Sequence, residues 1–125
     1  MHRKKTVLIA GALLMSLTII SGLALYVRAN ALPAEREIQI TAKKFQFAPD
    51  TITLKKGEPV LLVLSSQDSK HGFNLRGFGI RADFNPGGTA RIRFTPNKTG
   101  KFTFSCDVFC GEGHEDMTGT MVVAE

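Results

Sequence analysis

The sequence predicts an all-β protein, a small Greek-key β-sandwich that follows one N-terminal transmembrane helix. Two observations lead to this fold class. After Arg28, short stretches of alternating polar and apolar residues are separated by turn signals, and no segment has the 3.6-residue period of an amphipathic helix. Before Arg28, a basic head is followed by a long uncharged apolar run. About ninety residues of short strands suit a sandwich of two sheets.

The apolar run extends from Thr6 to Val27 and contains no charged residue. As a helix rising about 1.5 Å per residue it reaches roughly 33 Å, which spans the hydrocarbon core of a bilayer. A cleaved secretory signal is the alternative, because Ala29-Asn30-Ala31 has the small-x-small form of a cleavage site. The run is longer than the about 7–15 apolar residues of such signals, so we favour an uncleaved membrane anchor.

The anchor is expected to occupy residues 1–28, a linker residues 29–36, and a single exported domain residues 37–125. Because Arg3, Lys4 and Lys5 precede the apolar run, the positive-inside rule keeps that end in the cytoplasm. The expected location is therefore a prokaryotic cytoplasmic membrane, crossed once, with the domain on the periplasmic or extracellular side.

The net charge of +5 says little about partners. Arg28 and the three cations of the basic head account for four of the 16 Lys and Arg residues, which leaves 12 in the exported part against 11 Asp and Glu. This near-neutral balance does not support a nucleic-acid partner. The sequence also has no basic stripe with interleaved aromatic residues, which such a partner would require.

Five exported segments have strand patterns. Val60–Leu64 is continuously apolar, as expected of a strand that is buried on both faces. In the last of the five, Phe102, Phe104 and Cys106 lie on the same inward face, so that this strand delivers a cysteine to one end of the sandwich. The expected strands are Glu37–Lys43, Thr51–Lys55, Val60–Leu64, Arg91–Thr95 and Lys101–Cys106.

The chemistry is concentrated in the twelve residues from Cys106 to Met117, which hold both cysteines, one of three histidines and one of four methionines. Thiolate, imidazole and thioether ligands suit copper or zinc, and the thioether favours copper. A disulfide across so short a ring would be strained, and zinc would leave the methionine unexplained. His71, Cys110, His114 and Met117 satisfy a mononuclear blue-copper site, whereas the additional Cys106 suits a second copper ion.

The motif C-x3-C-x3-H-x2-M with an upstream histidine resembles the CuA site of cytochrome oxidase subunit II and of nitrous oxide reductase. Three further segments look like parts of that family: Asp68–Phe73 around the first histidine, the Pro86-Gly87 turn, and Gly119–Val123 as a closing strand. The resemblance covers Ile38 to the C-terminus and implies a cupredoxin-like fold.

The resemblance also implies a ligand set. Two copper ions would form a binuclear CuA centre, bridged by both cysteine sulfurs, with one histidine on each ion. The methionine would be a weak ligand, and a backbone carbonyl would complete the set. The residues so implied are His71, Cys106, Val108 (backbone carbonyl), Cys110, His114 and Met117. Many relatives have a glutamate in place of Val108 that helps to bind an interfacial magnesium or manganese ion, and valine cannot do so.

The resemblance implies electron transfer rather than catalysis on this chain alone, since no general acid, base or open coordination position is evident. A cytochrome c or other redox protein would donate electrons, and subunit I of a haem–copper oxidase would receive them at the membrane. Two alternatives remain: a copper-handling protein that delivers metal to an oxidase, and a free-standing mononuclear blue-copper carrier.

Three features near the motif have candidate roles. Phe73 and Phe109 adjoin ligands and are expected to shield the metal from water. Asp68 either orients the ligand His71 or is an ordinary solvated loop residue. Acidic residues around the motif either steer a basic electron donor or simply occupy an exposed loop; they are Asp107, Glu112, Glu115 and Asp116.

Overall fold

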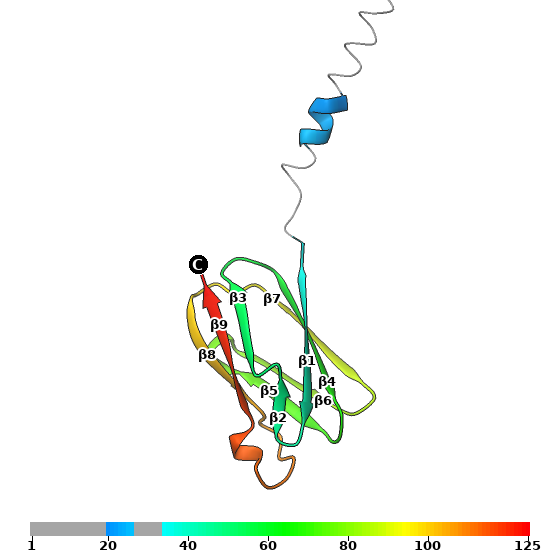
Figure 1. The fold of residues 1–125 in the computed structure, drawn as a ribbon, viewed down its shortest axis with the longest axis vertical. Coiled ribbons are helices and arrows are strands. Elements are labelled where there is room, and N and C mark those ends of the chain that lie inside the picture. Colours follow the sequence, from blue (N-terminus) through cyan, green and yellow to red (C-terminus); the bar gives the residue numbers. More distant parts are fainter. Residues whose placement is uncertain (1–19, 27–33) are drawn as a thin grey trace, which may run out of the picture. The chain divides into compact units, whose positions relative to one another are not determined.

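The computed structural model describes residues 20–26 and 34–125. The chain divides into two units, Met1–Pro33 and Ala34–Glu125. In the first unit residues 20–26 are helical (Figure 1). Most of the predicted span from Thr6 to Val27 lies outside the described residues. Within the described ranges, no helix combines the length and apolar character that crossing a membrane requires.

The second unit is a β-sandwich, as the sequence predicts. Within residues 34–125 nine strands form two sheets, with strand orders β2-β1-β4-β7 and β3-β9-β8-β5-β6 (Figure 1). Two short 3-10 helices, η1 (Arg76–Phe78) and η2 (His114–Asp116), join strands. The strands are β1 (Arg36–Lys43), β2 (Gln46–Ala48), β3 (Thr51–Lys55), β4 (Val60–Ser66), β5 (His71–Leu75), β6 (Ile80–Phe84), β7 (Thr89–Phe94), β8 (Gly100–Ser105) and β9 (Thr118–Ala124).

The sheets meet over a core of alternating inward residues and three interlocking rings. Phe47, Phe73 and Phe104 are fully buried, and their ring centroids lie 5.1 to 6.1 Å apart. Aromatic pairs at such separations add about 0.5–1.5 kcal/mol beyond the area they bury. One ring comes from the first sheet and two from the second, so this cluster fixes one sheet against the other.

Strand predictions based on a clear pattern are confirmed. β3 has the predicted bounds, and β4 is buried on both faces from Val60 to Leu64. β8 ends at Ser105, so Cys106 follows the strand rather than ending it. The sequence did not predict β5, because nearly all its residues are buried and no polar alternation marks it.

The fold places the ligand motif between two paired strands. β8 and β9 are antiparallel neighbours, and their last register pair is Ser105 with Thr118. The N–H of Cys106 then donates to the carbonyl of Met117 at 3.0 Å, which closes the base of the intervening loop. The loop, which contains η2, lies at the end of the sandwich drawn lowest in Figure 1.

Candidate metal centre

Two segments distant in the sequence supply the predicted ligands. His71 is the first residue of β5, and the others lie in the loop between β8 and β9. Four of them are sheltered from solvent: His71 and Met117 are fully buried, Cys106 is 6% exposed and Cys110 is 8% exposed. His114 is half-buried and is therefore the candidate ligand side chain nearest to solvent.

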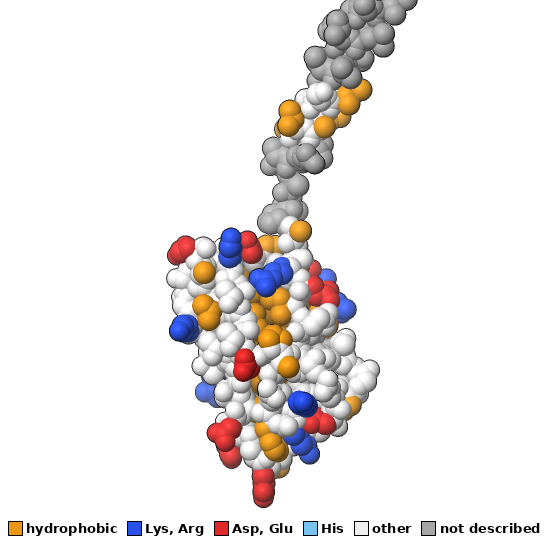
Figure 2. Space-filling model, in the orientation of Figure 1, with side chains coloured by type: hydrophobic (Ala, Val, Ile, Leu, Met, Phe, Trp, Pro, Cys, Tyr) orange, Lys and Arg blue, Asp and Glu red, His pale blue; other side chains and the backbone are white. Residues whose placement is uncertain are grey.

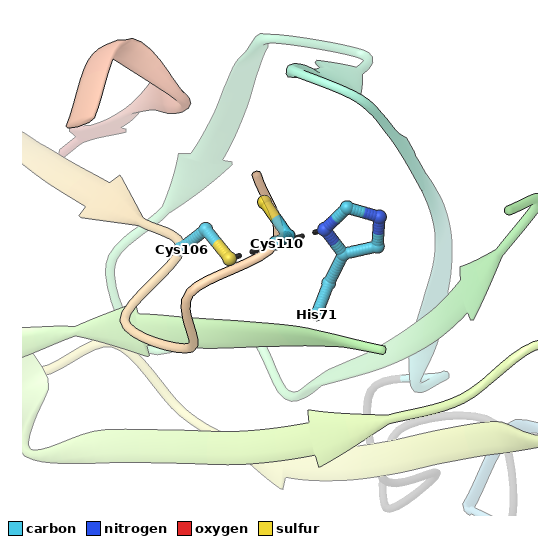
Figure 3. A group of neighbouring side chains, drawn as sticks. All are labelled: His71, Cys106 and Cys110. Atoms are coloured by element: carbon cyan, nitrogen blue, oxygen red, sulfur yellow. Dashed lines mark hydrogen bonds between the residues drawn. The ribbon is translucent and has the colours of Figure 1, made fainter. Parts of the chain in front are cut away.

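The two thiols lie next to different imidazoles. The donor atoms of His71, Cys106 and Cys110 all lie within 4.8 Å of one another, and Figure 3 shows the His71 ring directing one nitrogen towards the cysteines. Cys106 Sγ lies 3.9 Å from His71 Nδ1, whereas Cys110 Sγ lies 3.6 Å from His114 Nδ1. The structure thus brings two sulfur–nitrogen pairs together in one site.

The two remaining donors, a carbonyl and a thioether, also lie beside different thiols. Cys106 Sγ lies 3.2 Å from the carbonyl oxygen of Val108, and Cys110 Sγ lies 3.9 Å from Met117 Sδ. Each of the other predicted donors therefore lies beside one of the two thiols, around the group that His71, Cys106 and Cys110 form. Two thiols, two imidazoles, a thioether and a carbonyl are a donor set that fits copper.

Both cysteines are free thiols. Burial raises the pKa of the Cys110 thiol to about 11, and the neighbouring Cys106 adds to the rise. Without metal this thiol holds its proton at neutral pH. A cation that binds here must displace that proton, so metal binding is linked to proton release.

Asp68 orients His71. Its Oδ1 lies 2.7 Å from His71 Nε2, and its carboxylate accepts the N–H groups of Lys44 at 2.6 Å and Ser69 at 2.7 Å. Desolvation raises the pKa of Asp68, but these hydrogen bonds outweigh it and hold the pKa at about 2. A proton on Nε2 is donated to this anion, which leaves Nδ1 free to face Cys106. Of the two interpretations from the sequence, the structure favours the orienting role.

Phe45 is a contact that sequence reasoning missed. A β-carbon at Gly113 would lie 2.8 Å from its ring, and one at Gly111 would lie 3.2 Å away. Gly113 also has φ of 97°, where residues with a side chain are strained. The turn between β1 and β2 therefore packs directly on the loop backbone beside Cys110. The two glycines flanking Glu112 were the available signal of such a close approach.

Phe109 is 75% exposed, so it is not buried over the site as a core residue would be. Its ring centroid lies 5.9 Å from that of His114, so it forms a rim outside the site. Phe73, by contrast, is fully buried in the core. Glu112, Glu115 and Asp116 are exposed on the same loop, and Figure 2 shows acidic side chains at this end of the molecule.

The family model described as "Cupredoxin-like domain" matches residues 13–123. This chain belongs to the cupredoxin-like family. The cytochrome c oxidase subunit 2 of Thermus thermophilus is 31% identical to it over 93 residues, which cover 74% of this chain and 69% of that protein. The predicted resemblance to oxidase subunit II is thereby confirmed.

A nitrous-oxide reductase and a solved domain of an oxidase subunit II are also similar to this cupredoxin-like chain. The nitrous-oxide reductase of Cupriavidus necator is 32% identical over 90 residues, which cover 69% of this chain and 14% of the reductase. The periplasmic domain of subunit II of cytochrome oxidase from Bradyrhizobium japonicum superposes with a TM-score of 0.67 at 22% identity, covering 72% of this chain and 84% of that domain. This chain is thus similar to a small part of the reductase. The superposition on the oxidase domain shows that the two share a fold.

Proposed function

We propose that this chain is an electron-transfer protein of the oxidase subunit II type, built around a binuclear copper centre. One observation carries the proposal: each of the two buried thiols lies beside a different imidazole. Cys106 lies beside His71 on β5, and Cys110 lies beside His114 in the same loop. A mononuclear site would require one thiol, and Cys106 would then have no role. The 31% identity to the oxidase subunit 2 of Thermus thermophilus, over 74% of this chain, supports the same function.

The proposed ligands have distinct roles. The two cysteine sulfurs would be shared by the two ions, each imidazole would hold one ion, and the thioether and the carbonyl would be weak ligands. When bound, the copper pair supplies a one-electron carrier. The chain contributes ligands carried by a strand and by a loop closed at its base, in a buried setting that excludes water. The ligands are His71, Cys106, Val108 (carbonyl), Cys110, His114 and Met117.

We propose that electrons arrive at the His114 side of the centre. This ligand is the least buried, the exposed Phe109 ring lies beside it, and three exposed acidic residues are close to it in the chain. That combination suits a basic partner such as a cytochrome c, whose approach the negative charges accelerate. The acceptor would be subunit I of a haem–copper oxidase.

Reduction of the centre by a basic cytochrome should slow as ionic strength rises, and neutralising Glu115 and Asp116 together should reduce that dependence.

We propose that residues 1–28 anchor the chain in a prokaryotic cytoplasmic membrane. The support is the uncharged run from Thr6 to Val27 behind a basic head, which also places the copper domain on the periplasmic or outer side. Mass spectrometry of the mature N-terminus in cells that express the full chain tests this. A chain that starts at Leu32 in the soluble periplasmic fraction would contradict the anchor but not the copper site.

The copper stoichiometry of the full chain tests the function itself. The chain would be loaded under reducing conditions, because thiols in an oxidising compartment are prone to disulfide formation. We expect two copper ions per chain, a purple colour and an electron spin resonance signal shared by both ions. One copper ion with a blue colour would favour the mononuclear carrier instead. Rapid transfer of the metal to an oxidase would favour the copper-handling alternative.

A further inference from the structure

Asp107 lies between two proposed ligands, Cys106 and Val108, and its carboxylate is bound from neighbouring strands. Its Oδ2 accepts the Nε–H of Arg81 at 2.6 Å and the side-chain amide of Asn74 at 3.1 Å. Its side chain is 21% exposed, whereas that of Arg81 is 49% exposed. Two donors from neighbouring strands, β5 and β6, thus converge on one oxygen of a loop residue.

The other carboxylate oxygen rests on a glycine. A β-carbon at Gly72 would lie 2.2 Å from Asp107 Oδ1 and 3.2 Å from the backbone nitrogen of Val108. Only a residue without a side chain lets the loop come this close to β5. The N–H of Gly72 also points to Cys106 Sγ at 3.4 Å. The first half of the ligand loop is therefore pressed against the strand that carries His71.

Arg81 is itself held on its far side. Its terminal nitrogen lies 2.8 Å from Asp83 Oδ1, and Asp83 Oδ2 lies 3.0 Å from the ammonium of Lys70. An isolated exposed ion pair contributes little, because two long side chains must be ordered to form it. Here the guanidinium bridges two carboxylates, one on its own strand and one on the loop, so its orientation is fixed from both sides.

The two halves of the loop have different supports. Phe45 packs on the half that contains Gly111 and Gly113, whereas Asn74 and Arg81 hold the half from Cys106 to Val108. We propose that Asn74, Arg81 and Asp107 form a clasp that positions Cys106 Sγ and the Val108 carbonyl against His71, and so controls how tightly copper is retained. The inference rests on the proposed copper function and assigns these three as positioning residues.

Five variants of the full chain, one of them a control, test the clasp. Arg81→Gln and Asp107→Asn each weaken the hydrogen bond, and the double variant combines them. Asp83→Asn removes the other partner of Arg81 but leaves the bond to Asp107. Arg93→Gln is the matched control. Arg93 lies on β7, in the other sheet, and the change breaks its exposed ion pair with Glu35 (2.9 Å).

The first measurement needs no copper. Amide hydrogen exchange at residues 106–109 should be about tenfold faster in Arg81→Gln and Asp107→Asn, because the local opening of this half of the loop becomes easier. Arg93→Gln should stay within about twofold of the parent chain, and Asp83→Asn, which keeps the bond between Arg81 and Asp107, should fall between this control and Arg81→Gln. The double variant should not exceed the larger single effect, as expected of two partners in one interaction.

The second measurement uses the copper-loaded chain. Transfer of copper to an excess of the chelator bicinchoninate should be about tenfold faster for Arg81→Gln and Asp107→Asn, a typical effect of losing a group that orients a ligand. The electron spin resonance hyperfine pattern should also change. Equal behaviour of these variants and Arg93→Gln in both measurements would overturn the clasp.

The two proposals fail in different ways. If the parent chain bound fewer than two copper ions, the binuclear function would be wrong, and the exchange measurement would still decide the clasp. If the parent chain bound two ions and the clasp variants matched the control, the positioning role alone would be wrong.

Discussion

His71 divides its two ring nitrogens between two partners. Nε2 faces the Asp68 carboxylate, and Nδ1 faces the sulfur of Cys106. Because the imidazole is fully buried, neither nitrogen exchanges its partner for water. The backbone N–H groups of Lys44 and Ser69 hold the carboxylate in turn. A ligand in this setting is oriented before any metal arrives, which lowers the cost of binding.

Neutralising that carboxylate should alter the copper centre in a defined direction. In Asp68→Asn the imidazole loses an anion that favours the more positive, oxidised state, so the midpoint potential should rise. Copper affinity should fall about tenfold, because an orienting partner is lost. Redox titration and chelator competition measure the two effects. Glu58→Gln, in the exposed turn after β3, is the control and should change neither. A lowered potential in Asp68→Asn would contradict this account.

The two sulfur ligand types should respond differently to substitution. Cys106→Ser removes a proposed bridge, so the binuclear spectrum should be lost or converted to that of a different site. Met117→Leu keeps the buried volume and removes a weak ligand, so two copper ions should remain with a shifted potential. Copper analysis and electron spin resonance distinguish these results. Loss of copper from Met117→Leu, together with an unchanged spectrum in Cys106→Ser, would reverse the assigned roles.

At the scale of elements, the site depends on how firmly the two sheets hold each other. Phe104 on β8 packs against Phe47 and Phe73 and lies next to Gly119 on β9, where a β-carbon would be 2.2 Å from its ring. β8 and β9 are also the strands that flank the ligand loop. The packing that stabilises the domain is therefore the packing that fixes the ends of the loop.

Removing the Phe104 ring should destabilise the copper-free protein strongly. Phe104→Ala leaves a cavity in a fully buried position and should cost about 3–5 kcal/mol in the free energy of unfolding. Phe109→Ala is the control: its side chain is 75% exposed, and the change should stay within about 0.5 kcal/mol. Urea unfolding followed by circular dichroism measures both. Equal midpoints would contradict the assigned core.

How much the sequence predicted depended on the pattern available at each element. Alternation predicted β1 and β3, and a continuous apolar run predicted β4, because each pattern is local in the chain. The candidate ligands, which include the distant His71, came from the resemblance of the motif to a known family. β2, β5 and β6 were missed: β2 has only three residues, β5 is buried almost throughout, and β6 has an alternating pattern that the prediction did not use. The contacts of Asp107 with Asn74 and of Gly113 with Phe45 join residues far apart in sequence, and no local pattern encodes them.

Over the molecule as a whole, carboxylates paired in the folded state link stability to pH. A bond from Lys70 is the largest cause that lowers the pKa of Asp83, with Arg81 acting in the same direction. Asp68, as described, has its pKa lowered from 3.8 to about 2. A carboxylate with a depressed folded pKa stabilises the fold above its unfolded pKa, and this contribution disappears as pH falls through the folded value.

The copper-free protein should therefore lose stability as pH falls from about 5 towards 2. Asp68→Asn and Asp83→Asn should each flatten the curve in that range, and the effect of Asp83 should shrink in high salt because its pairs are exposed. Urea midpoints across the pH series measure this. A curve for Asp68→Asn that parallels that of the parent chain would contradict the assigned pairing.

The position of β9 has a consequence for the order of events during folding. β9 lies between β3 and β8, and its parallel pairing with β3 joins Thr51 to Thr120, residues far apart along the chain. Such long-range pairings form slowly. Until β9 inserts, the Ser105–Thr118 register does not exist and the two ends of the ligand loop are not held together. Copper capture should therefore wait for β9 to pair with β8, its neighbour in the chain, and not for the slower pairing of β9 with β3.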